Sequence, residues 1–183
     1  RLVRICTLLG STKVRLTGGE PLVRSDIGEL VSLLASVHGV KDLAMTTNGY
    51  MLAEKVDSLK EAGLDRLTIS LDTLDEEVFK DMNGRNFGNQ KVLAGIDAAE
   101  SVGYKPIKIN AVVKRGVNDH TILDLARYFK ERGHIVRFIE FMDVGTINKW
   151  TLGHVVSAAE IFEIINSELP IEPVESNYPG EVA

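Results

Sequence analysis

The chain has 183 residues, of which 44% are hydrophobic and 26% are charged, and its formal net charge is −5. This length allows one domain with a sizeable core, and the mild acidity gives no reason to expect a nucleic-acid-binding or membrane-binding surface. No apolar run is long enough to cross a bilayer and no signal-peptide pattern is present, so we expect a cytoplasmic protein. The single cysteine, Cys6, excludes an internal disulfide and a cysteine-based metal cluster within these residues.

The sequence opens inside an apparent helix. Apolar residues at helical spacing predict this helix over residues 1–10, with Gly10 at its C′ position. Cys6 lies within it and is expected to be a small packed hydrophobe. Because the chain starts at Arg1 without a cap and ends abruptly at Ala183, we expect a piece of a longer protein.

The sequence VRLTGGEP predicts a strand over residues 14–17 that ends in a bare turn. Apolar and polar residues alternate along it, as the two faces of a strand require. The Gly18–Gly19 pair then frees the backbone to turn and lets a ligand approach the main chain. Glu20 places a carboxylate at the lip of this turn, and Ser25 stands where a cap belongs before a helix over residues 26–37.

Further strands and helices alternate along the rest of the chain. Period-two patterns predict strands over residues 42–46, 65–71, 106–113 and 135–142. Helical stripes lie between these strands and end at Gly39, Gly63, Gly103 and Gly133. Helix starts are marked by two capping boxes and one capping residue, namely Thr73 with Glu76, Ser157 with Glu160, and Asn118 or Asp119.

Strands that recur every ~23–40 residues with helices between them predict an α/β fold with a parallel sheet. Crossovers of one hand let such a sheet open out or curl into a barrel. No GxGxxG fingerprint follows a strand, which favours a partial TIM-type barrel with parallel strands and outer helices over a dinucleotide-binding sheet. We expect the barrel core to span residues 1–169, and residues 170–183 to form an extended tail that leads to a further C-terminal segment.

The strand faces opposite the helix-facing apolar residues carry cations and polar groups, whereas a lumen packed only for stability is filled by Val, Ile and Leu. These faces present Arg15, Thr17, Thr46, Thr68, Ser70, Lys108, Asn110 and Arg137. Three cations in one concavity would repel one another, which predicts an anionic partner such as a polyphosphate at the C-terminal end of the strands. The alternative is a salt-bridge network in which Glu20, Asp72 or Glu140 neutralises them.

Other candidates for chemistry are weaker. The histidines lie at helix ends and in loops without ligand spacing, at His38, His120, His134 and His154. Ser70 belongs to no nucleophile-elbow motif and has no evident histidine base. We therefore assign no residue a catalytic or metal-binding role.

The ordered motifs RLTGGEP, TTNG, ISLDTLD, KIN, RFIEFM and YPGEVA resemble the radical S-adenosylmethionine (SAM) enzymes. The set is most similar to the GTP 3′,8-cyclases of molybdenum cofactor biosynthesis, and it runs across nearly the whole chain. In that family a reduced [4Fe–4S] cluster cleaves SAM to a 5′-deoxyadenosyl radical, which abstracts hydrogen from the GTP ribose. The ribose carbon then bonds to guanine C8, which gives (8S)-3′,8-cyclo-7,8-dihydroguanosine 5′-triphosphate.

The resemblance implies roles for particular residues. It assigns SAM binding to Gly18, Gly19, Glu20, Ser70 and Met142, with the GGEP turn at the methionyl amino end. It assigns GTP binding to Arg15, Thr46, Lys108 and Arg137, which agrees with the cation-rich face inferred from alternation. It implies a homodimer, whereas the sequence itself does not give the oligomeric state.

The sequence departs from the family pattern in its cysteines. Neither the family's CxxxCxxC loop nor the C-terminal cysteines of its second cluster has a counterpart here, and Cys6 cannot replace them because a cubane cluster needs three or four thiolates. We therefore expect the isolated chain to be catalytically inert. Two alternatives stay open: a different radical SAM enzyme, such as a maturase or peptide-modifying enzyme, and a cluster-free nucleotide-binding module.

Overall fold

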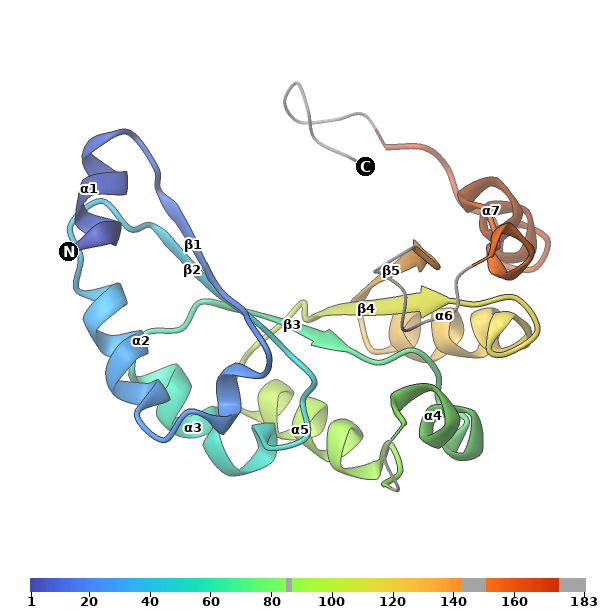
Figure 1. Ribbon diagram of the computed structural model, residues 1–183, viewed down its shortest axis with the longest axis horizontal. Helices are drawn as coiled ribbons and strands as arrows, with labels where there is room; N and C mark the ends of the chain where they lie inside the picture. The colour runs from blue at the N-terminus through green and yellow to red at the C-terminus, as the bar shows by residue number, and fades with distance from the viewer. Residues whose placement is uncertain (85–86, 143–150, 175–183) are drawn as a thin grey trace.

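The computed structural model describes residues 1–84, 87–142 and 151–174 (Figure 1). Helices and strands alternate along these ranges, and η marks a short 3₁₀ helix. The elements are α1 (Leu2–Leu8), β1 (Lys13–Leu16), η1 (Pro21–Val23), α2 (Ile27–Ala35), β2 (Asp42–Thr47), α3 (Leu52–Glu61), β3 (Arg66–Ser70), α4 (Glu76–Asn83), α5 (Gln90–Ser101), β4 (Lys108–Val113), η2 (Asp119–Thr121), α6 (Ile122–Glu131), β5 (Ile135–Glu140), η4 (Leu152–His154) and α7 (Ala158–Asn166).

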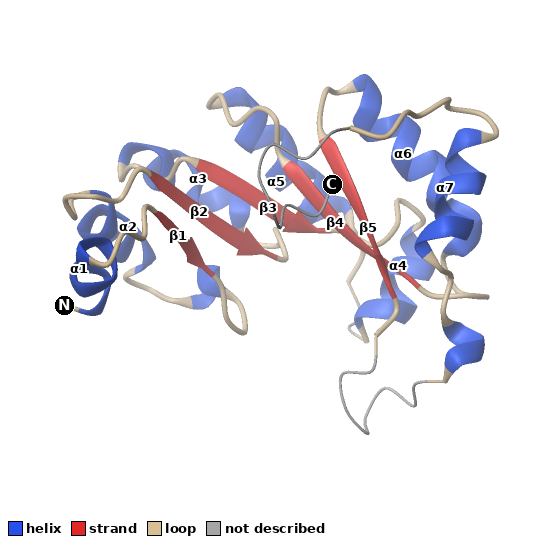
Figure 2. Cartoon of the chain, turned by 90° about the horizontal axis from the view of Figure 1, so that it is seen from above, coloured by secondary structure: helices blue, strands red, loops and turns tan. Residues whose placement is uncertain are grey.

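The strands form one parallel sheet in the order β1-β2-β3-β4-β5, so neighbours in the chain are neighbours in the sheet. Helices α2, α3, α5 and α6 lie on one face, below the strands in Figure 1. Figure 2, seen from above, shows the strands in front of these helices, and no helix of the described ranges covers the other face. The predicted α/β fold, a partial barrel with parallel strands and outer helices, is confirmed.

The core lies on the helix-covered face of the sheet. Leu43, Met45, Leu67, Ile69 and Ile109 are each at most 2% exposed and pack against the helices in one apolar cluster. Burying a side chain of this size contributes about 1.5–3 kcal/mol, so these positions hold the layers together. The opposite, open face is left to the polar residues of the same strands.

Two predicted helix caps are wrong because a neighbouring aspartate takes the position. α2 begins after Asp26 rather than Ser25, and the Asp26 carboxylate pairs with Arg24 instead of capping the helix. α4 is capped by Asp75, whose Oδ1 accepts two backbone hydrogen bonds from the first turn of that helix. The predicted cap Thr73 instead accepts a hydrogen bond from the Asp75 backbone N–H.

A third predicted cap is also wrong. Neither Asn118 nor Asp119 caps α6, which begins after Thr121. The buried Asn118 amide instead donates to two carbonyl groups at the ends of β3 and β4, and its oxygen accepts from the backbone N–H of Lys114. Asn118 thereby joins two strand ends.

The first helix is present as predicted, but its apolar stripe is not buried. Leu2 is 74% exposed, Leu8 is 87% exposed, and α1 has no buried residue. Cys6, expected to be a small packed hydrophobe, is half-buried and is thus packed only in part.

The predicted C-terminal tail is described only in part. Residues 170–174 have no regular structure, and the rest of the predicted tail, residues 175–183, lies outside the described residues. The boundary at residue 169 therefore stays a prediction.

In the part of the chain that the structure describes, every helix is too short or too polar to cross a membrane.

Candidate functional site

The open face of the sheet carries the predicted polar residues in register. Residues paired across parallel strands point to the same side, so each register row lines up across the face. From the carboxyl ends of the strands to the amino ends, the first, second and third rows are Ser70–Asn110–Arg137, Thr46–Thr68–Lys108 and Arg15–Ala44–Arg66. The structure therefore gathers all three predicted cations on one face.

These three cations have no carboxylate partner in the described ranges. Arg15 Nη1 donates a 3.3 Å hydrogen bond to the Thr46 hydroxyl, while Lys108 and Arg137 make neither a hydrogen bond nor an ion pair there. Burial, and then the positive charges of Arg137, Arg66 and Arg15, lower the pKa of Lys108 below its usual 10.5. An anion placed on this face would relieve that repulsion.

The predicted salt-bridge alternative fails because its carboxylates bind elsewhere. Glu20 binds the turn after β2. Asp72 Oδ1 accepts a 2.8 Å hydrogen bond from the Val112 backbone N–H, and burial raises the pKa of Asp72. Glu140 accepts a 2.6 Å hydrogen bond from the first turn of α7. Within the described residues, none of these three carboxylates pairs with Arg15, Lys108 or Arg137.

Two further cations of this face were missed: Lys13, two residues before Arg15 on β1, and Arg66. The more informative of the two is Arg66. Its parity with Thr68 and Ser70 along the strand places it on the same side, and that alternation could have revealed it. Arg66 pairs with Asp42 at the start of the neighbouring strand, through a 2.7 Å hydrogen bond from Nε to Oδ1 and a second contact from Nη2 to Oδ2. Arg66 also lies near Lys108, because both side chains line the same cavity of about 250 Å³.

The GGEP turn lies at the opposite end of the strands from Arg66. Gly18 has φ of 147°, a conformation that favours glycine, and a Cβ built on Gly18 or Gly19 would meet nothing within 4 Å. Glu20 fixes this turn: Oε1 accepts from the Leu22 backbone N–H at 2.9 Å and from the Thr47 hydroxyl at 2.6 Å. The turn thus presents exposed backbone from a rigid base.

The other predicted SAM-binding residues lie on different elements at the same end of the sheet. Ser70 is the exposed last residue of β3, next to β2, whose end binds Glu20. Met142 follows β5 at the far edge of the sheet and is 57% exposed. The structure thus brings the GGEP turn and the β3 strand that carries Ser70 to adjacent positions, whereas Met142 lies after β5, the edge strand.

A cavity of about 220 Å³ adjoins this end of the sheet. It is lined by Asn48, Ser70, Asp72, Phe79, Asn83 and Phe87. Polar groups and aromatic rings share it, a combination typical of small-molecule sites.

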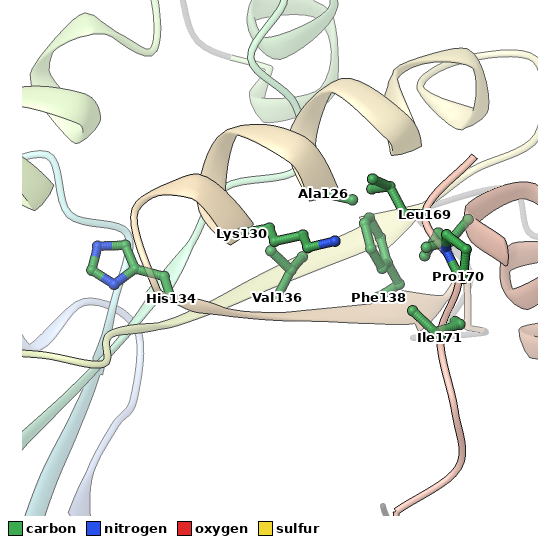
Figure 3. Close-up of a pocket in the computed structure, with 9 residues that line it drawn as sticks. Ala126, Lys130, His134, Val136, Phe138, Leu169, Pro170 and Ile171 are labelled. Atoms are coloured by element: carbon green, nitrogen blue, oxygen red, sulfur yellow. The ribbon is translucent and has the colours of Figure 1, made fainter.

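A larger cavity, of about 400 Å³, lies away from the cations at the edge of β5. Figure 3 shows Val136 and Phe138 of β5 facing Leu169 and Ile171 across it, with Ala126 of α6 above. Its lining is mostly apolar. We therefore place the candidate site by charge and register, on the open face.

The described residues do not assemble a metal centre. No group of three histidine, cysteine, aspartate or glutamate side chains is placed to hold a metal ion within residues 1–84, 87–142 and 151–174. His134, for example, is buried beside Glu100, with Nε2 2.7 Å from Oε1, and Nδ1 accepts from the Ile107 backbone N–H at 3.3 Å.

Comparison with known proteins adds a family. The family model described as the radical SAM superfamily matches residues 1–129. A GTP 3′,8-cyclase of Acidothermus cellulolyticus is 52% identical over 174 residues, which are 95% of this chain and 48% of that protein. A GTP 3′,8-cyclase of Xanthomonas axonopodis pv. citri is 48% identical over 182 residues, or 54% of its length. The chain therefore spans about half the length of these curated relatives.

A solved structure supports the fold. A domain of pyruvate-formate lyase-activating enzyme from Bacteroides vulgatus superposes with a TM-score of 0.66 at 19% identity. The match covers 86% of this chain and 94% of that domain.

Proposed function

Because the chain belongs to the radical SAM superfamily, we propose that it forms the substrate-binding and SAM-binding core of a GTP 3′,8-cyclase. This enzyme class joins ribose C3′ to guanine C8 of GTP. The observation that carries the proposal is the open face, where Arg15, Lys108 and Arg137 meet without a carboxylate partner in the described ranges. The relatives named GTP 3′,8-cyclase, at 48% and 52% identity, support the choice of GTP.

The cations of the open face would bind the triphosphate. Guanidinium groups match phosphate oxygens with paired donors, and an ammonium group adds a compact charge. Arg15 and Arg137 supply the first kind of donor and Lys108 the second, while the Thr46 hydroxyl keeps Arg15 in place. Their share in the reaction is to hold the substrate in one orientation on the sheet, which lowers the entropic part of the barrier.

The GGEP turn would bind SAM. Gly18, Gly19 and Glu20 form an open backbone surface on a base fixed by hydrogen bonds, which fits an amino acid moiety that needs main-chain partners. Ser70 and Met142 extend this surface along the carboxyl ends of the strands. These assignments place SAM beside the first row of the open face and thus next to the nucleoside of GTP.

The chain's own residues do not fit an iron–sulfur cluster. The sequence has one cysteine, which is half-buried on α1, whereas a cubane cluster takes three or four thiolates. We therefore assign this chain no step of cluster chemistry. Its residues bind, orient and shield the two ligands.

The proposal is tested on the natural protein that carries this chain, in full. The protein is reconstituted anaerobically with iron and sulfide and given SAM, a reductant and GTP. We expect both 5′-deoxyadenosine and a cyclised GTP product. Replacing Arg137 with alanine should abolish the cyclised product, whereas Arg127→Ala, on the outer helix α6, should not.

Each outcome separates the alternatives. Deoxyadenosine without GTP turnover keeps the superfamily but moves the protein to another radical SAM reaction, such as that of a maturase. Failure to take up a cluster at all, with GTP still bound, indicates a nucleotide-binding module.

A further inference from the structure

Arg66 is a cation of the open face that the proposed GTP site leaves unused. It is the first residue of β3 and stands in the third row, where Ala44 separates it from Arg15. Ala44 is buried and contributes only a methyl group between the two arginines. Two guanidinium groups therefore flank one small residue.

Asp42 orients the Arg66 side chain. Nε and Nη2 of Arg66 both pair with the Asp42 carboxylate, a two-point contact that fixes the plane of the guanidinium. The Nη1 donors have no partner in the described ranges. The Arg66 side chain stays 41% exposed while that of Asp42 is 20% exposed, so the donors that are left remain accessible.

The cavity of about 250 Å³ lies beside these donors. Arg66 and Lys108 line it together with Ala44, Leu67, Thr68, Asp65 and the loop of residues 103–106, which contributes Lys105. The Asp65 carboxylate already has a partner, because its Oδ2 accepts a 2.7 Å hydrogen bond from the Leu43 backbone N–H. The cavity sits at the amino ends of β2, β3 and β4, and Lys108, which the family resemblance assigned to GTP, belongs to its lining. Three cations and one carboxylate thus border a concave space whose size suits part of a small anionic ligand.

The cations form a ladder along the strands. Arg137 stands in the first row with Ser70, Lys108 stands in the second row, and Arg15 and Arg66 share the third. Successive rows are two residues apart, or about 7 Å. Because the proposed SAM surface adjoins the first row, the ribose of the substrate belongs there and its phosphates extend toward the third row.

We propose that Arg66, oriented by Asp42, is a further substrate-binding residue that contacts the terminal phosphate of a nucleoside triphosphate. This proposal rests on the proposed function, which identifies the ligand as a nucleotide. The position of SAM beside the first row then sets the direction in which the phosphates extend. The cavity then reads the length of the phosphate chain: a triphosphate reaches Arg66, and a monophosphate ends before it. Arg66 is thereby a residue of substrate specificity rather than of general anion attraction.

The test is an anaerobic calorimetric titration of the full natural protein with GTP, GDP and GMP. We expect Arg66→Ala to weaken GTP binding by about tenfold or more, as for a lost charged hydrogen bond, and GMP binding by less than about twofold, since no contact is lost there. Arg66→Lys should lie between, because it keeps the charge and loses the two-point contact with Asp42. Arg127→Ala is the matched control: Arg127 also pairs with one carboxylate, that of Glu168, and its side chain is 43% exposed.

The outcomes separate this proposal from the proposed function. Equal weakening of all three nucleotides by Arg66→Ala, or no weakening, overturns the role of Arg66 while GTP binding by the unaltered protein still supports the function. No GTP binding by the unaltered protein overturns the function itself. SAM binding and thermal unfolding report whether each variant folds, and if Arg66→Ala does not, a lowered ratio of GTP to GMP affinity in Arg66→Lys decides the matter.

Discussion

The carboxylate of Glu20 accepts a 2.6 Å hydrogen bond from the hydroxyl of Thr47, and this bond joins the GGEP turn after β1 to the turn after β2. The second oxygen of Glu20 accepts a 2.8 Å hydrogen bond from the Asn48 backbone N–H. One side chain thus sets the relative position of two turns that border the proposed SAM surface.

Replacing Glu20 with glutamine should weaken the hydrogen bonds that connect these two turns. The new amide NH₂ group faces donors that need acceptors, so one or two hydrogen bonds are lost at about 1–3 kcal/mol of stability. Thermal unfolding should show the loss, and calorimetric titration should show weaker SAM binding. Glu29→Gln, on the exposed side of α2, is the control and should change neither. Unchanged stability in Glu20→Gln would contradict the role of these hydrogen bonds.

Replacing Lys108 with methionine should weaken GTP binding without destabilising the free protein. Burial and neighbouring cations lower the pKa of Lys108, so its charge is a cost in the absence of an anion. Loss of a charged contact to phosphate predicts GTP affinity about 10- to 100-fold lower. Titration with GTP measures the loss of affinity, and thermal unfolding without nucleotide measures the stability of the free protein. The control is Lys130→Met, an exposed lysine on α6, for which GTP affinity should stay unchanged.

The Lys108 prediction has a pH dependence. In the folded protein the ammonium group loses its proton at lower pH than in the unfolded chain, so stability should rise with pH between the lowered pKa and 10.5. Lys108→Met should remove this rise. Urea unfolding across that range measures it, and an identical rise in the variant would contradict the assignment.

His134 should make the fold sensitive to mild acid. Burial lowers its pKa below 6.5, against the opposing effect of Glu100. Because the unfolded chain binds the proton first, stability should fall as the pH drops below 6.5, by at most about 1.4 kcal/mol per pH unit. Urea unfolding at pH 7.5 and pH 5.5 should show a smaller loss for His134→Gln than for the unaltered protein. The exposed His38→Gln should keep the full loss; equal losses in all three would contradict the prediction.

The Ser157–Glu160 capping box, which was correctly predicted, should stabilise α7 in a pH-dependent way. The Ser157 N–H, and then Arg115, lower the pKa of Glu160 to about 2. The contribution should be complete above pH 4.5 and lost as the pH falls through about 2. Melting temperatures of Glu160→Gln should lie below those of the unaltered protein at pH 7 and converge with them in acid. Glu163→Gln, exposed on the same helix, should show no such difference.

Alternation in the sequence predicted the faces of the sheet because side-chain direction in a strand depends only on parity. Arg15, Lys108 and Arg137 therefore fell on one face as expected. Parity does not identify partners, so the Asp42–Arg66 pair was missed although both residues lie within predicted strands or at their edges. Pairing depends on the register between strands, which the sequence of one strand does not contain.

Local signals were less reliable at helix ends. Ser25 and Thr73 have the chemistry of a cap, but Asp26 and Asp75 take those places. At α4 the Asp75 carboxylate accepts the backbone hydrogen bonds that Thr73 was expected to accept, whereas at α2 no side chain accepts them. The apolar stripe of α1 was predicted correctly as a stripe but is not buried. Helical spacing predicts which face of a helix is apolar, but it does not predict which element packs against that face.

The sequential order of the strands has a consequence for how the chain folds. Each strand pairs only with the strand made just before it and the one made just after it. Pairing in sequence order keeps the loop between paired strands short for a parallel sheet, which limits the entropy lost when each loop closes. The sheet can therefore grow strand by strand during synthesis, with each new unit docking on a completed edge. The third row of the open face is complete as soon as β3 has docked, before β4 and β5 exist, so a nascent chain holds the Arg15–Arg66 pair of cations before it holds Lys108 or Arg137.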